Sequence, residues 1–195
     1  MKNLDKRNKI IEYSLRLNST NLSPLRSGNI SLRSNEKDTD GYLITPSGKK
    51  YESLKPEDIV FMGLNEEIEK NNLELNPSSE WRFHRDIYVN KKDAGAIVHA
   101  HSPHATAVSS HRKSIPPFHY MIALAGGNDI KCAEYATFGT EELSKNIIEA
   151  LEERTACLMS NHGQVAFGKN LEYAFELAQE IENICHQYTI ALKLG

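Results

Sequence analysis

Apolar residues recur along the chain in two patterns, one with the spacing of helices and one typical of short buried strands. Leu4, Ile11 and Leu15 share helix-compatible spacing near the start of the chain. Thr140 and Asn170 are expected to cap two later helices, because each directly precedes a segment with helical spacing. Helices are predicted at about 3–17, 79–90, 102–112, 140–153 and 171–192.

Strands are predicted where short apolar runs are bounded by turn residues. Such runs lie near 95–100, 156–160 and 163–167, and EDIVFM is another. GYLITPSGKKYESL reads as a strand, a Pro-Ser-Gly turn and a short return. Strands and helices interleave with short connections, which favours a layered α/β domain with a mixed or largely antiparallel sheet. A length of 195 residues fits a single domain over 1–195.

Composition narrows the possible functions. The net charge of -3 and the scattered basic pairs argue against a nucleic-acid-binding surface. The N-terminus lacks the apolar core of a signal peptide, and no run approaches the roughly 18 apolar residues of a membrane span. Cys132, Cys157 and Cys185 match neither a disulfide framework nor a CxxC motif. We therefore expect a cytoplasmic protein with buried thiols and no membrane partner.

The segment IVHAHSPH at 97–104 contains the first candidate chemistry. Alternation along a strand would place His99 and His101 on the same side, about 7 Å apart, where both could reach one cation. A hydrogen-bonded pair at a sheet edge explains the same pattern. His104, His111, His119 and His186 lack comparable spacing and are expected to be ordinary packed or exposed residues.

A third imidazole follows in CLMSNHGQVAFG, where His162 lies in a tight turn between two apolar runs. The turn alone could account for Asn and Gly, with the histidine incidental. If His162 joins the other pair, three imidazoles would leave an open coordination position on Zn²⁺, as in catalytic sites. His84 is expected in the core or behind the ligands.

Three further segments predict an anion site. In NPSSEWRFHRDIYVN, Ser78 and Ser79 stand at a helix start, where free N–H groups and the dipole favour negative charge. Glu80 follows in the first turn. The alternative is that Ser79 caps this helix and Glu80 only complements the dipole. The loops LRSGNISLR and TPSGKK would add the backbone amides of Gly28, Asn29, Ser47 and Gly48.

Taken together, these segments resemble the class II aldolase/adducin family. The H-x-H and NHG patterns mark the family, and PSSEWRFH, HYMIALAGGN and YATFGT resemble its aldolase branch. The matching segments span about residues 26–168 and are SGNIS, LITPSG, PSSEWRFH, IVHAHSPHATAVS, SIPPFHYMIALAGGN, CAEYATFGTEELS and SNHGQVAFG. The resemblance implies a three-layer α/β/α domain around a mixed, mainly antiparallel sheet.

The resemblance also implies roles for individual residues. One Zn²⁺ per subunit would be held by His99, His101, His162 and Glu80, and Glu80 would also be the catalytic base. Tyr120 would act in the active site of a neighbouring subunit in a homotetramer, and Phe138 would lie beside the aldehyde pocket. The substrate phosphate would be held by Gly28, Asn29, Ser47, Gly48, Ser78 and Ser79.

The reaction implied is cleavage of a phosphorylated sugar. A ketose 1-phosphate, first of all L-fuculose 1-phosphate, would give dihydroxyacetone phosphate and lactaldehyde through an enediolate whose charge zinc offsets. A deoxy-ketose substrate such as 5-deoxyribulose 1-phosphate fits the same residues.

The other members of the family fit these residues less well. The ribulose-phosphate 4-epimerase branch carries aspartate where this chain has Glu80, and the dehydratase for methylthioribulose 1-phosphate differs near that residue. A non-catalytic adducin-like module would lack the histidines. Family aldolases also carry a C-terminal tail with another tyrosine, whereas this sequence ends at ALKLG, so the aldehyde specificity stays open.

Overall fold

A sheet of seven strands organises the molecule. The computed structural model describes residues 1–36, 38–65 and 76–195. The strands are β1 (Asn29–Glu36), β2 (Thr39–Ile44), β3 (Val60–Gly63), β4 (Ala96–Ala100), β5 (Cys132–Ala133), β6 (Ala156–Met159) and β7 (Gly163–Gly168). Their order in the sheet is β3-β2-β1-β4-β7-β6-β5. All described pairs are antiparallel except β5 with β6, which confirms the predicted mixed, mainly antiparallel sheet.

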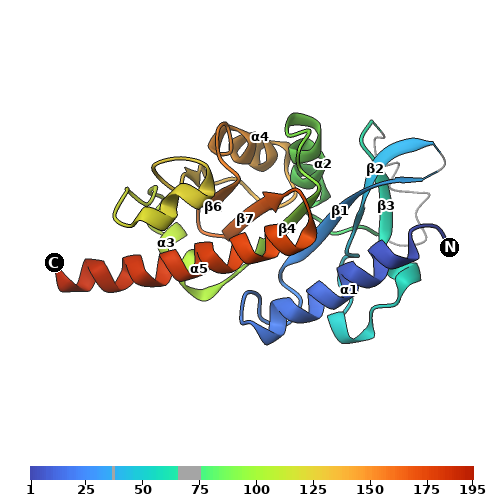
Figure 1. Ribbon diagram of the computed structural model, residues 1–195, viewed down its shortest axis with the longest axis horizontal. Coiled ribbons are helices and arrows are strands. Elements are labelled where there is room, and N and C mark those ends of the chain that lie inside the picture. The colour runs from blue at the N-terminus through green and yellow to red at the C-terminus, as the bar shows by residue number, and fades with distance from the viewer. Residues whose placement is uncertain (37, 66–75) are drawn as a thin grey trace.

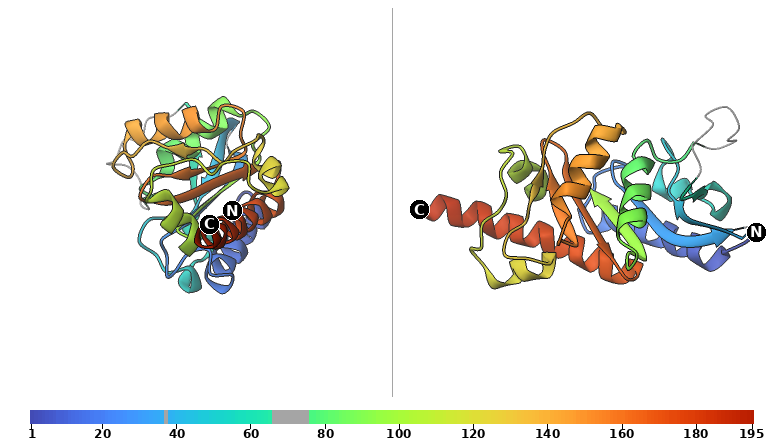
Figure 2. Two further views of the ribbon diagram at one scale, coloured as in Figure 1. Left: turned by 90° about the vertical axis from the view of Figure 1, so that its left-hand side faces the viewer. Right: turned by 90° about the horizontal axis from the view of Figure 1, so that it is seen from above.

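Helices cover both faces of this sheet. The α-helices are α1 (Leu4–Ser19), α2 (Trp81–Asn90), α3 (Pro103–Ser109), α4 (Glu141–Ala150) and α5 (Leu171–Leu194). Short 3-10 helices are η1 (Tyr51–Ser53), η2 (Pro56–Asp58) and η3 (Tyr120–Ala125). Helices α1 and α5 lie on one face, whereas α2 and α4 lie together on the other (Figures 1 and 2). The predicted three-layer α/β/α domain is confirmed.

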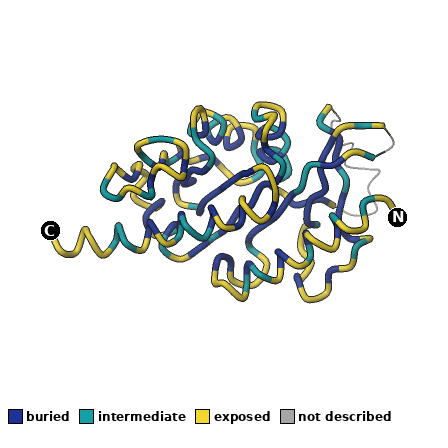
Figure 3. Tube along the Cα trace, in the orientation of Figure 1, coloured by how far each residue is buried: buried dark blue, intermediate teal, exposed yellow. Residues whose placement is uncertain are grey.

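Strand β4 lies in the centre of the sheet and separates two apolar cores. Figure 3 shows it among the buried segments, and each of its residues is buried. Ala96, Val98 and Ala100 belong to the core under α1 and α5, while Ile97 belongs to the core under α2 and α4. By the same alternation His99 faces the α2 side, where its ring lies 5.5 Å from that of Phe83.

Several sequence expectations need correction. Leu4 and Leu15 are 48% and 42% exposed, because α1 packs through Ile10, Tyr13 and Leu17 instead. The return after the Pro-Ser-Gly turn is the 3-10 helix η1 rather than a strand. Predicted caps fared better: Thr140 Oγ1 accepts from Leu143 N, and Asn170 Oδ1 accepts from Tyr173 N.

Helix α2 begins later than predicted, which bears on the site. Glu80 is its N-cap residue, with φ -101° and ψ 13°, and makes no side-chain capping bond. Ser79 therefore precedes the helix and does not cap it. The side chain of Glu80 is consequently available for other contacts.

Two remaining expectations concern the cysteines and membrane-spanning segments. Cys132, Cys157 and Cys185 are free thiols, the last two fully buried. None of the helices within the described parts of the chain is both long and apolar enough to cross a membrane.

Candidate metal centre and cleft

Four side chains converge on one point at the end of β4. Glu80, His99, His101 and His162 each offer a ligand atom, and these atoms lie within 4.8 Å of one another. His99 Nε2 lies 2.9 Å from His101 Nε2 and 3.1 Å from Glu80 Oε2. His162 Nε2 lies 3.2 Å from Glu80 Oε1. The structure thus brings together the whole ligand set predicted from the sequence.

Backbone geometry explains how the turn before β7 delivers His162. Asn161 has a left-handed φ of 57°, which closes the tight turn from β6. A Cβ atom at Gly163 would lie 2.4 Å from the Ala100 carbonyl oxygen. Glycine is required there because the turn packs directly on the end of β4, and this close approach places His162 beside His101.

The protonation of the histidines suits metal ligation. His99 Nδ1 donates to the Gln164 carbonyl at 2.8 Å, which directs Nε2 at the centre. Burial lowers the pKa of His101 to about 3 and that of His162 to about 4, so both rings are neutral at pH 7. Neutral imidazoles carry the lone pairs that a divalent cation needs.

Glu80 is held as an anion inside this cluster. Burial alone would raise the pKa of its carboxyl, but His99 and His162 and the Asn29 amide lower it well below the ordinary value. The same carboxylate raises the pKa of His99 against the opposing effect of burial. Glu80 Oε1 is buried and accepts no hydrogen bond from the residues that the structure describes. A buried, unbonded carboxylate oxygen facing three imidazoles fits a divalent cation.

Glu80, His101 and His162 line a cleft of about 350 Å³, a size that accommodates small ligands, whereas His99 is fully buried. Phe138 and Tyr135 are 63% and 51% exposed at this cleft, so an aromatic surface faces any bound molecule. The lining comprises Ser27, Ser79, Glu80, His101, Tyr135, Ala136, Phe138, Asn161 and His162.

Three loops predicted to bind anions meet beside this cleft. Ser78 N donates to Thr45 O at 3.0 Å, and Ser47 N donates to Asn76 O at 2.9 Å. Thr45 N in turn donates to Ile30 O at 3.1 Å. These bonds join the segments around residues 28–30, 45–48 and 76–79 into one unit.

The predicted phosphate residues differ in what they present. Ser79 is exposed at the cleft and Gly48 has open space around it, whereas Ser78 is buried. Gly28 packs against β4, where a Cβ would lie 2.7 Å from the His99 carbonyl oxygen. The Asn29 side chain is also buried, and its amide nitrogen donates to Glu80 Oε2 at 2.9 Å.

Within one chain, Tyr120 lies apart from the cleft. It is 80% exposed, in η3, and lines a separate hollow together with Phe118 and His119. The structure of the single chain therefore does not bring Tyr120 to Glu80. Its expected role requires a second subunit and stays a prediction.

Five residues at or near the cleft were not predicted from the sequence. Ser27, Tyr135 and Asn161 line it, and Arg112 Nε donates to Asn161 Oδ1 at 2.7 Å. Arg26 Nη1 donates to the Gly48 carbonyl at 2.8 Å and so brings a guanidinium to the loops. These contacts join distant parts of the chain, so no local sequence pattern predicts them.

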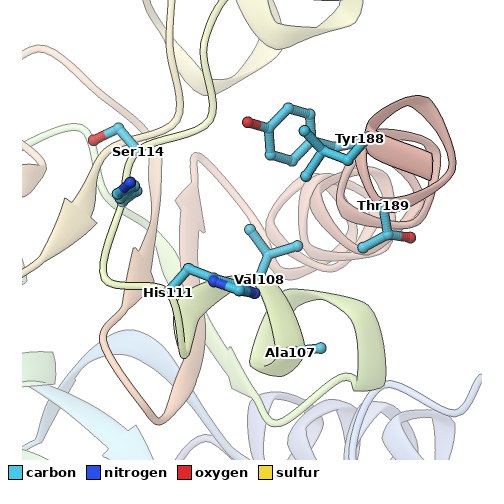
Figure 4. Close-up of a pocket in the computed structure, with 8 residues that line it drawn as sticks. Ala107, Val108, His111, Ser114, Tyr188 and Thr189 are labelled. Atoms are coloured by element: carbon cyan, nitrogen blue, oxygen red, sulfur yellow. The ribbon is translucent and has the colours of Figure 1, made fainter. Parts of the chain in front are cut away.

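Another cavity, of about 410 Å³, lies between α3 and the C-terminal half of α5 (Figure 4). Val108, Tyr188 and Leu192 make much of its lining apolar. Among the described residues, none lines both this cavity and the Glu80 cleft. The smaller cleft is therefore the candidate active site.

Comparisons with known proteins agree with this geometry. The family model for the class II aldolase and adducin N-terminal domain matches residues 8–189. The L-fuculose phosphate aldolase of Escherichia coli is 46% identical over 185 residues, covering 95% of this chain and 83% of the relative. The 5-methylthioribulose-1-phosphate/5-deoxyribulose-1-phosphate aldolase of Rhodospirillum rubrum is 43% identical over 189 residues, covering 97% and 82%.

A solved structure of an L-fuculose 1-phosphate aldolase superposes with a TM-score of 0.90 at 40% identity, covering 98% of this chain and 88% of the other. This similarity extends over the sheet, its flanking helices and the segments that carry Glu80 and the three histidines. The chain belongs to the class II aldolase and adducin family, within which it is an aldolase of the fuculose-phosphate aldolase type, and hence a lyase.

Proposed function

We propose that this chain is a zinc-dependent aldolase that cleaves L-fuculose 1-phosphate to dihydroxyacetone phosphate and lactaldehyde. The observation that carries the proposal is the convergence of Glu80 with three imidazoles at a cleft bordered by three donor-rich loops. The similarity to L-fuculose phosphate aldolases supports the choice of substrate.

The ligand set favours zinc over harder cations. His99, His101, His162 and Glu80 supply three nitrogen donors and one oxygen, a combination that suits Zn²⁺ better than Mg²⁺ or Ca²⁺. When bound, the ion supplies Lewis-acid stabilisation of the negative charge that develops as the carbon–carbon bond breaks.

We assign the proton transfer at the substrate carbon to Glu80. Asn29 holds Oε2, while Oε1 accepts no hydrogen bond from any described residue, and Glu80 lines the cleft. In the cleavage direction Glu80 returns a proton to the dihydroxyacetone phosphate fragment, and in condensation it removes that proton.

The loops orient the substrate through its phosphate. Ser79, Gly48 and Ser47 present hydroxyl and amide groups, with Ser78 and Gly28 shaping the loops behind them. The N-terminus of α2 and the Arg26 guanidinium add positive charge to this rim. We assign the Asn29 side chain to Glu80 rather than to the phosphate, because its amide nitrogen already donates to that carboxylate. Binding energy gained far from the breaking bond positions the reacting carbons.

We assign Tyr120 a role that depends on the assembly of several subunits. Its exposure on η3 suits a homotetramer in which it enters a neighbouring cleft, protonates the aldehyde oxygen in condensation and takes the proton back in cleavage. Phe138 would then contact the aldehyde. Mixing Tyr120→Phe with Glu80→Gln, each inactive alone, should restore activity in mixed tetramers. Absence of restored activity in verified mixed tetramers would contradict the shared site.

A second substrate has specific support. The Rhodospirillum rubrum relative is named for 5-methylthioribulose 1-phosphate and 5-deoxyribulose 1-phosphate, and it is nearly as similar to this chain as the Escherichia coli enzyme. The cleft mouth formed by Tyr135 and Phe138 is where these substrates would differ, because all share the phosphorylated end. The free thiols suit a reducing compartment, and we place the activity in the cytoplasm.

The deciding experiment is a cleavage assay on a panel of ketose 1-phosphates, read by the dihydroxyacetone phosphate released. We expect the highest kcat/KM with L-fuculose 1-phosphate and loss of activity after EDTA, with recovery on adding Zn²⁺. Full activity after verified metal removal, or borohydride trapping of a lysine–substrate adduct, would overturn the mechanism. A higher kcat/KM with 5-methylthioribulose 1-phosphate or 5-deoxyribulose 1-phosphate would show that this compound, and not L-fuculose 1-phosphate, is the preferred substrate.

A further inference from the structure

Behind Glu80, a line of buried polar side chains runs between β1 and α2. Asn29 Oδ1 lies 2.5 Å from His84 Nε2. Ser31 Oγ lies 2.7 Å from His84 Nδ1 and 2.9 Å from the Tyr88 hydroxyl. All four of these side chains are buried, and the line ends at Glu80 through the amide nitrogen of Asn29.

The line forms because polar residues on one side of β1 face polar residues on one side of α2. Asn29 and Ser31 are two residues apart on β1 and therefore face the same side. Glu80, His84 and Tyr88 recur every four residues along one side of α2. Asn29 also lies opposite His99 in the sheet, which keeps the line beside the ligand cluster.

Chemistry fixes the direction of every hydrogen bond in the line. The Glu80 carboxylate only accepts, so Asn29 presents its nitrogen to Glu80 and its oxygen to His84. His84 Nε2 must then carry the hydrogen. Burial lowers the pKa of His84 to about 3, so the ring is neutral and Nδ1 accepts from Ser31. The Ser31 oxygen in turn accepts from the Tyr88 hydroxyl.

A purely structural role would favour apolar residues at these positions. Burying polar groups costs free energy that their mutual hydrogen bonds only offset. Without the His84 N–H, the buried Asn29 oxygen loses its hydrogen-bond donor, and only the bond to Glu80 still holds the amide. An amide fixed at one end only positions the Glu80 carboxylate less firmly.

We propose that His84, held by Ser31 and Tyr88, is a positioning residue that locks the Asn29 amide and thereby the Glu80 carboxylate. The orientation of the Asn29 amide between Glu80 and His84 stands on the contacts alone. Only the kinetic consequence rests on the proposed function, since it requires Glu80 to move a proton.

The test compares two neighbouring tyrosines. The Tyr42 and Tyr88 rings lie 5.2 Å apart, both are buried, and each loses one hydroxyl on mutation to phenylalanine. Only Tyr88 belongs to the line, because the Tyr42 hydroxyl donates to the Trp81 carbonyl. Tyr88→Phe should lower kcat a few-fold and Ser31→Ala about tenfold, with KM and zinc content unchanged. Tyr42→Phe should leave kcat and KM unchanged.

Nitrogen NMR of the imidazoles provides a readout that does not depend on turnover. In the parent protein we expect His84 to be neutral with hydrogen on Nε2. In Ser31→Ala we expect the same tautomer with a shifted Nδ1 resonance, because that nitrogen loses its hydrogen-bond donor. His84→Phe should broaden or shift the Asn29 side-chain amide signals and lower kcat by about 10- to 100-fold with zinc retained. If His84→Phe does not fold, the kcat values of Ser31→Ala and Tyr88→Phe still test the proposal.

Two results would overturn the proposal: a parent His84 carrying its hydrogen on Nδ1, or parental kcat in both Ser31→Ala and Tyr88→Phe. A folded His84→Phe variant with parental kcat would do the same. Failure of the proposed function looks different, because the parent enzyme would then cleave no ketose 1-phosphate while the His84 tautomer remained as described.

Discussion

Two clusters in this protein combine histidines with a glutamate beside the first residues of a helix, yet the two clusters differ in geometry and bonding. In the first, Glu80 at the start of α2 meets His99, His101 and His162. In the second, Glu182 of α5 meets His104 at the start of α3, and His186 stacks on His104.

The clusters differ in how their rings are oriented. The three rings of the first cluster are nearly perpendicular to one another, at 72–85°, and their Nε2 atoms face a common point. In the second cluster His104 and His186 lie 4.0 Å apart at 25°, nearly parallel. Parallel stacked rings point their nitrogen lone pairs along separate planes, so they do not converge on one ion.

The glutamates differ in how fully they are bonded. Glu182 Oε1 accepts from the His104 backbone N–H at 3.0 Å and Oε2 accepts from that of Ala105 at 2.9 Å, so its carboxylate caps α3 from another helix. Within the described part of the chain, the Glu80 side chain makes no capping bond to α2, and its Oε1 accepts no hydrogen bond. Residue types alone do not mark a functional site; convergent donors with unmet bonding capacity do.

The largest effect expected is on metal content. His101→Ala and His162→Ala should each lose bound zinc and lower activity by more than about 10³-fold, because each removes one donor. The matched change His186→Ala in the second cluster should keep one zinc per subunit. Elemental analysis of purified protein measures both. Equal zinc loss in all three variants would break the distinction between the clusters.

Next in size is the exchange of each glutamate for glutamine. Glu80→Gln should lower kcat by about 10²- to 10⁴-fold, because the amide cannot accept the proton, while zinc stays bound. Glu182→Gln should leave kcat within twofold of the parent. Steady-state kinetics with zinc-saturated enzyme distinguishes these outcomes. A Glu80→Gln enzyme at the parental rate would show that the base is another group.

The three histidines could be predicted because they lie in local patterns, whereas Glu80 was assigned as a ligand only through the family resemblance. Alternation in 97–101 places His99 and His101 on one side, and the Asn-His-Gly turn marks His162. The same 99–104 segment could not show that His104 contacts Glu182, since that contact joins residues 78 apart. The helical half of the buried line behind Glu80 has a pattern in the sequence, because Glu80, His84 and Tyr88 share helical spacing. Its strand partners depend on how α2 packs on β1.

The predicted fold shows the same division between local and long-range information. Strand runs and caps such as Thr140 and Asn170 follow from neighbouring residues. The buried side of α1 does not, because Leu4 and Leu15 have helical spacing but the sheet is contacted through Ile10, Tyr13 and Leu17. Packing between elements decided which of two possible faces became buried.

A third prediction concerns the rim, which only the first cluster possesses. Arg26→Ala should raise KM for the sugar phosphate about tenfold with little change in kcat, because one charge-assisted contact contributes about 1.5 kcal/mol. The effect should shrink at high salt, since the side chain is exposed at the loops. Lys92→Ala, an equal loss of charge at the other end of β4, is the control and should leave KM unchanged. Unchanged KM in Arg26→Ala would remove the guanidinium from the phosphate site.

The smallest effect separates stability from activity in the second cluster. Glu182→Ala should lower the free energy of unfolding by about 0.5–2 kcal/mol, because two N–H groups at the start of α3 lose their acceptor. Glu176→Ala, at an exposed position of the same helix, should change it by less than about 0.5 kcal/mol. Urea unfolding measures the difference between the two variants. If Glu182→Ala instead lowered kcat with stability intact, the second cluster would take part in the reaction, and the bonding state of a glutamate would no longer separate the two.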